Sequence, residues 1–152
     1  MKQLYLLAFL LLGIILVCLG QPSKTAENNQ KINQYIRTGD AASLSQYMQD
    51  MVELVMNHTA ETYSKNQVTS ILKEFFRENP PQNFEVLQSW KEDEATYTLG
   101  TYTSTNEMQY RFYYAVKKSG QNKNAKVSVY HINIEQTKKC KNKCTQNQNV
   151  SK

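Results

Sequence analysis

Histidine, the side chain best suited to acid–base chemistry at neutral pH, is scarce in this 152-residue sequence. There are two histidines, His58 and His131. His58 continues the alternation of apolar residues over 52–56, so it is the imidazole that could point into a core as a proton acceptor. It also stands at the end of that alternation, and we favour a solvated loop histidine. The sequence therefore predicts no catalytic residue.

Two of the three cysteines, Cys140 and Cys144, are separated by three residues. We expect a disulfide across this small loop in an oxidising compartment. Two thiols with no further ligand at metal-binding spacing do not complete a zinc site. The sequence predicts neither a metal nor a cofactor.

Aromatic residues are abundant, and nine tyrosines lie downstream of residue 20. A cavity lined with tyrosine could bind a flat apolar or sugar-like ligand through ring faces and hydroxyl groups. For most of these rings we favour a simple core role. The candidates for lining a pocket are Tyr47, Phe76, Trp90, Tyr97, Tyr110 and Tyr114.

The N-terminus has the layout of a secretory signal peptide. Lys2 is followed by an uncharged apolar run over 4–19 and then by Gly20. The run is short for a membrane-spanning helix, and no second one follows. Val17 is too bulky for the position before a lipidated Cys18. We expect a signal peptide over 1–20 cleaved after Gly20, with export to the periplasm or secretion; the alternative is an uncleaved anchor.

The positive charge is concentrated in a C-terminal tail. Residues 137–152 contain five lysines and no acidic residue. Residues 21–136 then hold 12 basic and 13 acidic residues, a net charge of −1. Nucleic-acid-binding domains spread Lys and Arg over a face, so no nucleic acid is expected as a partner. We predict one domain over 21–136 and a flexible Lys-rich tail over 137–152.

Local signals predict three helices in the first half of that domain. A polar helix over 24–38 should end at Gly39, and Asp40 should cap a short second helix. Ser64 and Gln67 have capping-box spacing. The apolar stripe that follows predicts a third helix, which the Asn-Pro-Pro sequence at 79–81 ends; its members are Val68, Ile71, Leu72, Phe75 and Phe76.

Strands are predicted over 51–57, 83–92, 95–104, 107–118 and 126–136. Two-residue turns at 93–94 and 105–106 would pair Trp90 with Tyr97 and Leu99 with Phe112, and a longer turn over 119–125 would pair Phe112 with Ile132. This register gathers apolar residues on one face: Phe84, Val86, Trp90, Tyr97, Leu99, Met108, Tyr110, Phe112, Tyr114, Tyr130, Ile132 and Ile134. The opposite face receives Thr98, Gly100, Tyr102, Gln109, Arg111, Tyr113, His131, Asn133 and Glu135.

Five polar residues of the second face could be taken for a site: Arg111, Tyr113, His131, Asn133 and Glu135. The predicted register places Tyr113 opposite His131 and Arg111 opposite Asn133. We favour a solvent-facing or dimer-forming sheet surface with ordinary cross-strand pairs.

The predicted fold class is α+β, with a curved antiparallel sheet wrapped around helices. This order of elements resembles the nuclear transport factor 2-like (cystatin-like) superfamily, whose members form a cone. The chain is most similar to small exported bacterial proteins known as a domain of unknown function. The resemblance covers about residues 30–135 and rests on Gly39-Asp40-Ala41, Tyr63-Ser64-Lys65, Phe75-Phe76, Pro80-Pro81, Phe84, Leu99-Gly100 and Arg111-Phe112.

The resemblance implies an internal cavity and homodimers through the outer sheet face, but no activity, because this fold serves enzymes and non-enzymes alike. We expect an exported, non-catalytic domain that binds a small apolar or aromatic ligand or a protein partner. The alternative is a cavity enzyme (a proton-transfer isomerase, dehydratase or hydrolase) that uses His58 or a tyrosine as acid–base. A third reading is a surface-associated protein whose Lys-rich tail does the binding.

Overall fold

The structure is a computed structural model that describes residues 24–119 and 126–137. The predicted signal peptide, the pair Cys140 and Cys144, and the residues after 137 lie outside the described residues. Over the described part of the chain, no helix is long and apolar enough to cross a membrane. The elements are α2 (Lys24–Thr38), α3 (Ala41–Ser45), β1 (Met48–Met56), β2 (Thr59–Ser64), α4 (Lys65–Glu78), β3 (Pro81–Glu92), β4 (Ala95–Ser104), β5 (Gln109–Ser119) and β6 (Lys126–Thr137).

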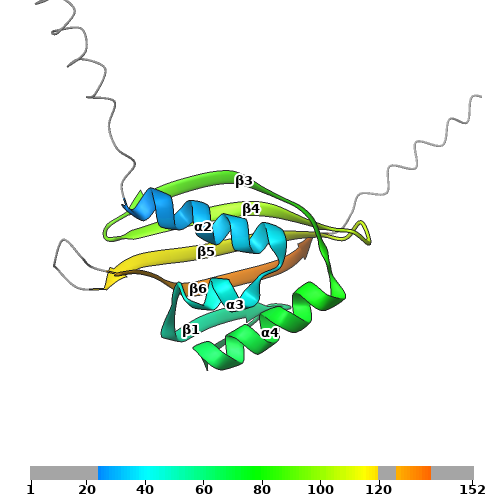
Figure 1. Ribbon diagram of the computed structural model, residues 1–152, viewed down its shortest axis with the longest axis horizontal. Helices are drawn as coiled ribbons and strands as arrows, with labels where there is room; N and C mark the ends of the chain where they lie inside the picture. The colour runs from blue at the N-terminus through cyan, green and yellow to red at the C-terminus, as the bar shows by residue number, and fades with distance from the viewer. Residues whose placement is uncertain (1–23, 120–125, 138–152) are drawn as a thin grey trace, which may run out of the picture.

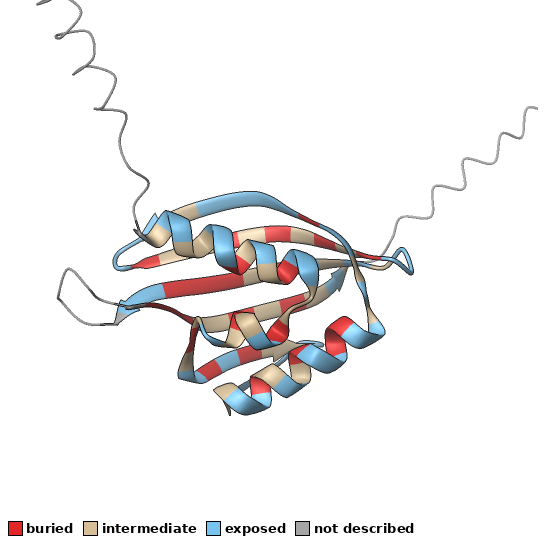
Figure 2. Ribbon diagram, in the orientation of Figure 1, coloured by how far each residue is buried: buried red, intermediate tan, exposed pale blue. Residues whose placement is uncertain are grey.

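The predicted α+β class is confirmed: over the described residues, one curved six-stranded sheet carries α2, α3 and α4 on the same side (Figure 1). The strand order is β2-β1-β6-β5-β4-β3. Helix α2 packs on the β3 side, whereas α4 packs on β1 and β2. Buried residues gather where the helices meet the sheet (Figure 2), and this inner face forms the hydrophobic core, with Ile32, Ile36, Leu72, Phe112 and Ile132 at its centre.

The local helix signals predicted the helices well. The Ser64–Gln67 capping box is present, with Gln67 Oε1 accepting from the Ser64 backbone N–H at 3.0 Å. Gly39 has a φ of 69°, the left-handed conformation that glycine adopts without a Cβ penalty. Asp40 caps α3 by accepting from the Ser43 backbone N–H. Hydrogen bonds from the Ser43 hydroxyl and from its backbone N–H lower the pKa of the Asp40 carboxyl.

The sheet contains one strand and one pairing mode that the sequence did not predict. Strand β2 forms a hairpin with β1, and β1 pairs in parallel with β6. The sheet is therefore mixed rather than wholly antiparallel. Strand β2 was missed because its polar side chains give no alternating apolar signal; it is an exposed edge strand.

A β-bulge at Leu87 overturns part of the predicted facing of β3 and β4. Trp90 pairs with Tyr97 as predicted, but Val86 pairs with Gly100 and Gln88 with Leu99, so Leu87 is an extra residue. Because side chains alternate along a strand, one extra residue turns everything after it to the other face. Phe84 is therefore buried inside, whereas Trp90 lies on the outer face.

Strand β4 is reversed relative to the prediction. Thr98, Gly100 and Tyr102 are buried on the inner face, and Tyr97 and Leu99 alternate with them on the outer face. The reason lies in the β4–β5 loop, which spans 105–108 rather than two residues, and in which Glu107 has a φ of 63°. The longer loop pairs Gly100 with Phe112 and Leu99 with Tyr113.

The β5–β6 pairing is shifted by two residues, which keeps the paired side chains from His131 onward on their predicted faces. Phe112 lies opposite Ile134 rather than Ile132, and Tyr114 opposite Ile132 rather than Tyr130. A second bulge, after Ala115, leaves Tyr130 unpaired and moves it from the predicted inner face to the outer one.

Gly100 is required by the ring of Phe84. A Cβ at position 100 would lie 2.5 Å from Phe84 Cε2 and 2.7 Å from the Glu85 carbonyl oxygen. Phe84 is fully packed, with its ring centroid 5.9 Å from that of Phe112, so it has little room to move away.

We predict that Gly100→Ala lowers the free energy of unfolding by about 1–3 kcal/mol, the usual cost of overpacking a core. Urea denaturation measures the loss. In a Phe84→Leu background the same substitution should cost less, because the clash with the ring is gone and only the contact with the Glu85 carbonyl oxygen remains. Equal costs in the two backgrounds would contradict the proposed role of the ring.

Candidate functional site

A cleft of about 1050 Å³ lies between the N-terminal half of α2 and the inner face of the sheet. It lies at the end of the sheet that carries the β3–β4 turn. We call it the α2 cleft. The described residues that line it are Thr25, Ala26, Asn29, Gln30, Asn33, Val86, Ser89, Lys91, Asp93, Glu94, Thr96, Thr98, Val116, Lys117, Lys118 and Val127.

Helix α2 supplies a wall of carboxamides. Asn29, Gln30 and Asn33 lie on one face of the helix because residues three and four apart are neighbours. The Tyr114 hydroxyl donates to Asn33 Oδ1 at 2.8 Å, which fixes the Asn33 amide. Asn29 Oδ1 is buried and has no hydrogen-bond partner among the described residues.

The sheet side of the cleft has a floor of apolar side chains and a row of hydroxyl groups. Val116 and Val127 are almost fully buried. The Ser89 and Thr98 hydroxyl oxygens are 3.3 Å apart, and Ser89 also donates to the Tyr97 carbonyl at 3.0 Å. The bulge at Leu87 turns Ser89 and Lys91 toward the cleft.

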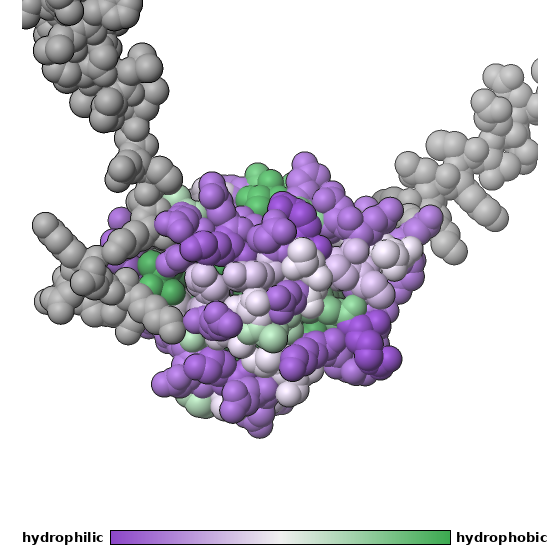
Figure 3. All heavy atoms as spheres, viewed as in Figure 1, coloured by the Kyte–Doolittle hydropathy of each residue, from purple (hydrophilic) through white to green (hydrophobic). Residues whose placement is uncertain are grey.

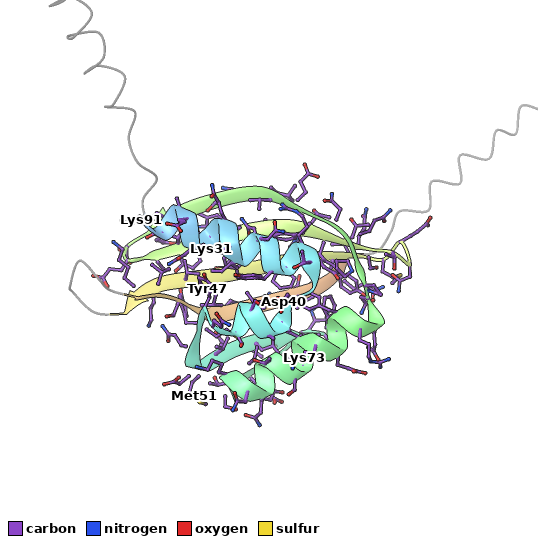
Figure 4. The ribbon with its side chains drawn as sticks, viewed as in Figure 1. Lys31, Asp40, Tyr47, Met51, Lys73 and Lys91 are labelled. Carbon is purple, nitrogen blue, oxygen red and sulfur yellow. The ribbon has the colours of Figure 1, made fainter. Side chains whose placement is uncertain are left out.

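Charged residues stand only at the rim. Lys91, at the end of β3, lies beside the first turn of α2 (Figure 4). Lys118 is the second cation, and Asp93 and Glu94 in the β3–β4 turn supply two carboxylates. Lys117 also borders the cleft, but its Nζ lies 5.1 Å from the centre of the Tyr130 ring.

The described lining of the cleft has no histidine or cysteine, and its only carboxylates are those of the turn. General acid–base catalysis needs a titratable group within hydrogen-bonding reach of the reacting atom. Over the described residues, no group of three or more His, Cys, Asp or Glu could hold a metal ion. The lining of the cleft can donate and accept hydrogen bonds beside a floor of apolar side chains.

None of the six aromatic residues predicted as pocket candidates lines the cleft. Phe76, Tyr110 and Tyr114 belong to the core or pack against it, and Tyr47 packs on Tyr35 with ring centroids 5.8 Å apart. Tyr114 reaches the cleft indirectly, through its hydrogen bond to Asn33.

The other two candidates, Trp90 and Tyr97, lie on the outer face of the sheet. Trp90 stacks on Tyr97 with centroids 5.5 Å apart, and Tyr97 on Tyr113 at 6.0 Å. Tyr113 then meets the edge of His131 at 5.3 Å. With Tyr130, whose hydroxyl donates to the Tyr97 hydroxyl at 3.3 Å, these residues form what we call the outer aromatic strip.

The outer aromatic strip covers part of the sheet. Ala115 pairs with Tyr97 and His131 and so shares their face, yet it is fully buried. Burial raises the pKa values of Tyr113 and Tyr130, so both phenols stay neutral at physiological pH. At the other end, His131 Nδ1 lies 2.7 Å from Glu53 Oε2 on β1.

The polar group predicted on this face is present but paired differently. Arg111 lies opposite Glu135 and Tyr113 opposite Asn133, whereas the prediction paired Tyr113 with His131. His58 is exposed in the β1–β2 turn, with a φ of 65°, and does not line the cleft. The helix-bearing face is largely hydrophilic, with apolar side chains visible in small separate areas (Figure 3).

The cleft residues were missed because neutral polar side chains form no recognised motif. The available signal was the spacing of Asn29 and Asn33 beside the buried positions Ile32 and Ile36. That spacing places two carboxamides at the border of the apolar stripe, where a helix leaves the sheet.

Residues 29–135 match a family model described as "Domain of unknown function (DUF4783)". A crystal structure of a DUF4783 family protein from Bacteroides ovatus superposes with a TM-score of 0.65 at 27% identity, covering 70% of this chain and 93% of that chain. A second, from Bacteroides fragilis, gives 0.64 at 23% identity, covering 70% and 96%.

The fold is also similar to more distant structures. An NTF2-like protein of unknown function from Shewanella baltica has a TM-score of 0.54 at 9% identity, covering 77% of this chain and 98% of that chain. This likeness concerns the fold alone, and it confirms the predicted cone-type architecture. No curated protein matches the sequence.

The Tyr114 hydroxyl beneath the cleft gives a pH prediction. Burial raises the pKa of Tyr114 to about 12, against about 10 in an unfolded chain. Because the folded pKa is the higher one, the stabilisation is complete below pH 10 and is lost as the pH rises from 10 toward 12.

The measurement is the ultraviolet titration of tyrosinate in the wild type minus that in Tyr114→Phe. The difference should show one phenol with a midpoint near pH 12 while the protein stays folded. A midpoint near pH 10 would mean that the hydroxyl is open to water and not held beneath α2.

Proposed function

This chain belongs to the family described as a domain of unknown function (DUF4783), and we propose that it is a non-catalytic domain that binds a small ligand in the α2 cleft. The observation that carries the proposal is the lining of the cleft. Neutral amides and hydroxyl groups surround an apolar floor formed by valine side chains. A lining of this composition favours ligand binding over catalysis.

The absence of an interior base in the described lining argues against the alternative of a cavity enzyme. A proton-transfer enzyme of this architecture would place a carboxylate or imidazole inside the cavity with its pKa adjusted by burial. His58 lies in an exposed turn, and the tyrosine nearest the cleft, Tyr114, has a pKa too high for a base at neutral pH.

We further propose that the domain works outside the cytosol. Residues 1–20 have the composition of a signal peptide cleaved after Gly20, and the Cys140–Cys144 spacing suits a disulfide formed after export. The binding domain would then span 21–136 and be followed by the Lys-rich tail over 137–152.

A second candidate function is self-association through the outer aromatic strip. An antiparallel sheet face turned to solvent usually carries polar side chains, whereas this one carries four aromatic rings besides His131. Charges of both signs flank them, Lys117 and Arg111 on one hand and Glu53 and Glu135 on the other. A twofold contact can pair such charges with their opposites in the second copy.

The binding proposal predicts that filling the cleft removes ligand binding. Val86 lines the cleft and is 37% exposed, whereas its neighbour Leu87 is 60% exposed and does not line it. Val86→Trp should therefore fill the cleft, and Leu87→Trp is the matched control.

Ligand-observed NMR with a fragment set of sugars, carboxylates, amides and aromatic compounds gives the readout. We expect the wild type and Leu87→Trp to bind the same fragments, and Val86→Trp to lose at least tenfold in affinity. Equal binding by Val86→Trp would exclude the α2 cleft, and a wild type that binds no fragment would contradict the proposed function.

Self-association predicts a dimer in sedimentation velocity at micromolar concentration. Tyr97→Arg should shift the protein to monomer by placing an unpaired charge within the outer aromatic strip, and Gln34→Arg on α2 should leave the dimer intact. A wild-type monomer at these concentrations would rule this candidate out and leave the cleft proposal untouched.

A further inference from the structure

On the outer face of the sheet, two tyrosine side chains meet at their hydroxyl groups. The Tyr130 hydroxyl donates a hydrogen bond to the Tyr97 hydroxyl at 3.3 Å. The hydroxyl groups of Tyr102, Tyr110 and Tyr114 donate to amide or carbonyl oxygens instead. Tyr97 and Tyr130 therefore contact each other at the end of the ring where a phenol is oxidised.

A contact between two phenol hydroxyl groups suits oxidative coupling of the rings. A tyrosyl radical carries its unpaired electron on the phenolic oxygen and on the ortho and para carbons. The ortho carbons (Cε) flank the carbon that bears the hydroxyl group, so rings that meet at their hydroxyl ends bring Cε atoms toward each other. Rings that stack face to face do not, and Tyr113 stacks on Tyr97 with an angle of 20° between the ring planes. Tyr130 is therefore better placed than Tyr113 to couple with Tyr97.

The neighbouring rings of the outer aromatic strip can pass oxidation to Tyr97. The ring centroids of Trp90, Tyr97 and Tyr113 are 5.5–6.1 Å apart. Tryptophan and tyrosine are the aromatic side chains that lose an electron most easily, and Trp90 lies on the edge strand β3, where an oxidant has access. An electron lost from one ring of this cluster can be replaced from the next, so oxidation that begins at Trp90 can reach Tyr97.

A covalent bond between these two rings would tie β4 to β6 across β5. The described strands contain no cysteine, so a disulfide cannot make this connection. A cross-link between positions far apart in the sequence lowers the entropy of the unfolded chain and so favours the folded state. Oxidation at this contact would therefore stabilise the sheet.

We propose that Tyr97 and Tyr130 are a site of oxidative modification, at which hydrogen peroxide and a haem peroxidase join them into a dityrosine within one chain. Each phenol gives up one electron and its hydroxyl proton, and a bond forms between one Cε of each ring. The hydrogen on each joined carbon then moves to the phenolic oxygen, which restores both aromatic rings. The two electrons and two protons reduce the peroxide to two molecules of water. This modification is independent of ligand binding in the α2 cleft.

The test treats the protein, purified after expression of the full-length chain, with a haem peroxidase and hydrogen peroxide. Dityrosine fluorescence gives the yield, and tandem mass spectrometry of a tryptic digest identifies the joined peptides. Trypsin releases residues 127–138 as a peptide in which Tyr130 is the only tyrosine. Peptides are a better readout than whole-chain mass, because peroxide also adds oxygen to the exposed Met51. A dilution series separates coupling within one chain from coupling between chains.

We expect one principal cross-linked product, in which Tyr97 is joined to Tyr130 at a yield independent of protein concentration. Tyr97→Phe and Tyr130→Phe should each lower the dityrosine fluorescence at least fivefold, because each removes one hydroxyl group of the contact. Tyr35→Phe is the matched control, since Tyr35 also lies beside a tyrosine, Tyr47, with ring centroids 5.8 Å apart. This control should react like the wild type. The cross-linked protein should unfold at a higher urea concentration than the untreated protein.

Three outcomes would overturn the assignment. The first is a cross-link between other tyrosines, such as Tyr35 and Tyr47. The second is a product of doubled mass whose yield rises with protein concentration, which would place these rings at a contact between two copies. The third is an absence of dityrosine from protein that keeps its folded circular dichroism spectrum. The fragment screen against Val86→Trp tests the α2 cleft separately from all three.

Discussion

The structure depends on the close contact between the ring of Phe84 and the bare Cα of Gly100. Because no Cβ stands at position 100, the end of the Phe84 ring can approach the β4 backbone there while the ring packs on Phe112 in the core. This contact fixes the first half of β3 on the inner face. The bulge at Leu87 then reverses the second half, so that Ser89 and Lys91 face the α2 cleft and Trp90 faces outward. The Phe84–Gly100 contact and the extra residue Leu87 thus place the first half of β3 in the core and turn Trp90, in its second half, to the outer face.

Helix α2 makes a cleft because its inner face changes character along its length. Toward its C-terminal end, Ile32 and Ile36 are fully buried, and Arg37 donates to the Phe84 carbonyl at 3.2 Å. One turn earlier, Asn29 takes the place of an apolar residue. There the Tyr114 hydroxyl links the helix to the sheet, 2.8 Å from Asn33 Oδ1 and 3.5 Å from the Asn29 carbonyl oxygen. Amides cannot pack on valine methyl groups as isoleucine does, so the helix and the sheet separate there and leave room for a ligand.

Sequence reasoning succeeded where the determining interactions are local. The capping box at Ser64 and the left-handed Gly39 are decided within a few residues, and the helices they bound were predicted closely. The facing of β4 was wrong, because it depends on a loop conformation at Glu107 and on a bulge at Leu87 that leave no mark in composition. The cleft was missed for a related reason: Asn29 becomes notable only when the fold buries its oxygen.

The parallel pairing of β1 with β6 has a consequence for how the chain folds. Strand β1 lies near the start of the domain, and its partner, β6, is the last strand of the sheet. Closing this contact brings together residues about eighty positions apart, such as Leu54 and Ile132. Contacts of such long sequence separation slow folding, because the entropy of closing the loop is lost before the contact forms. During synthesis, the β1–β2 hairpin must wait with an unpaired edge until nearly the whole domain has left the ribosome, which makes that edge the segment most exposed to aggregation.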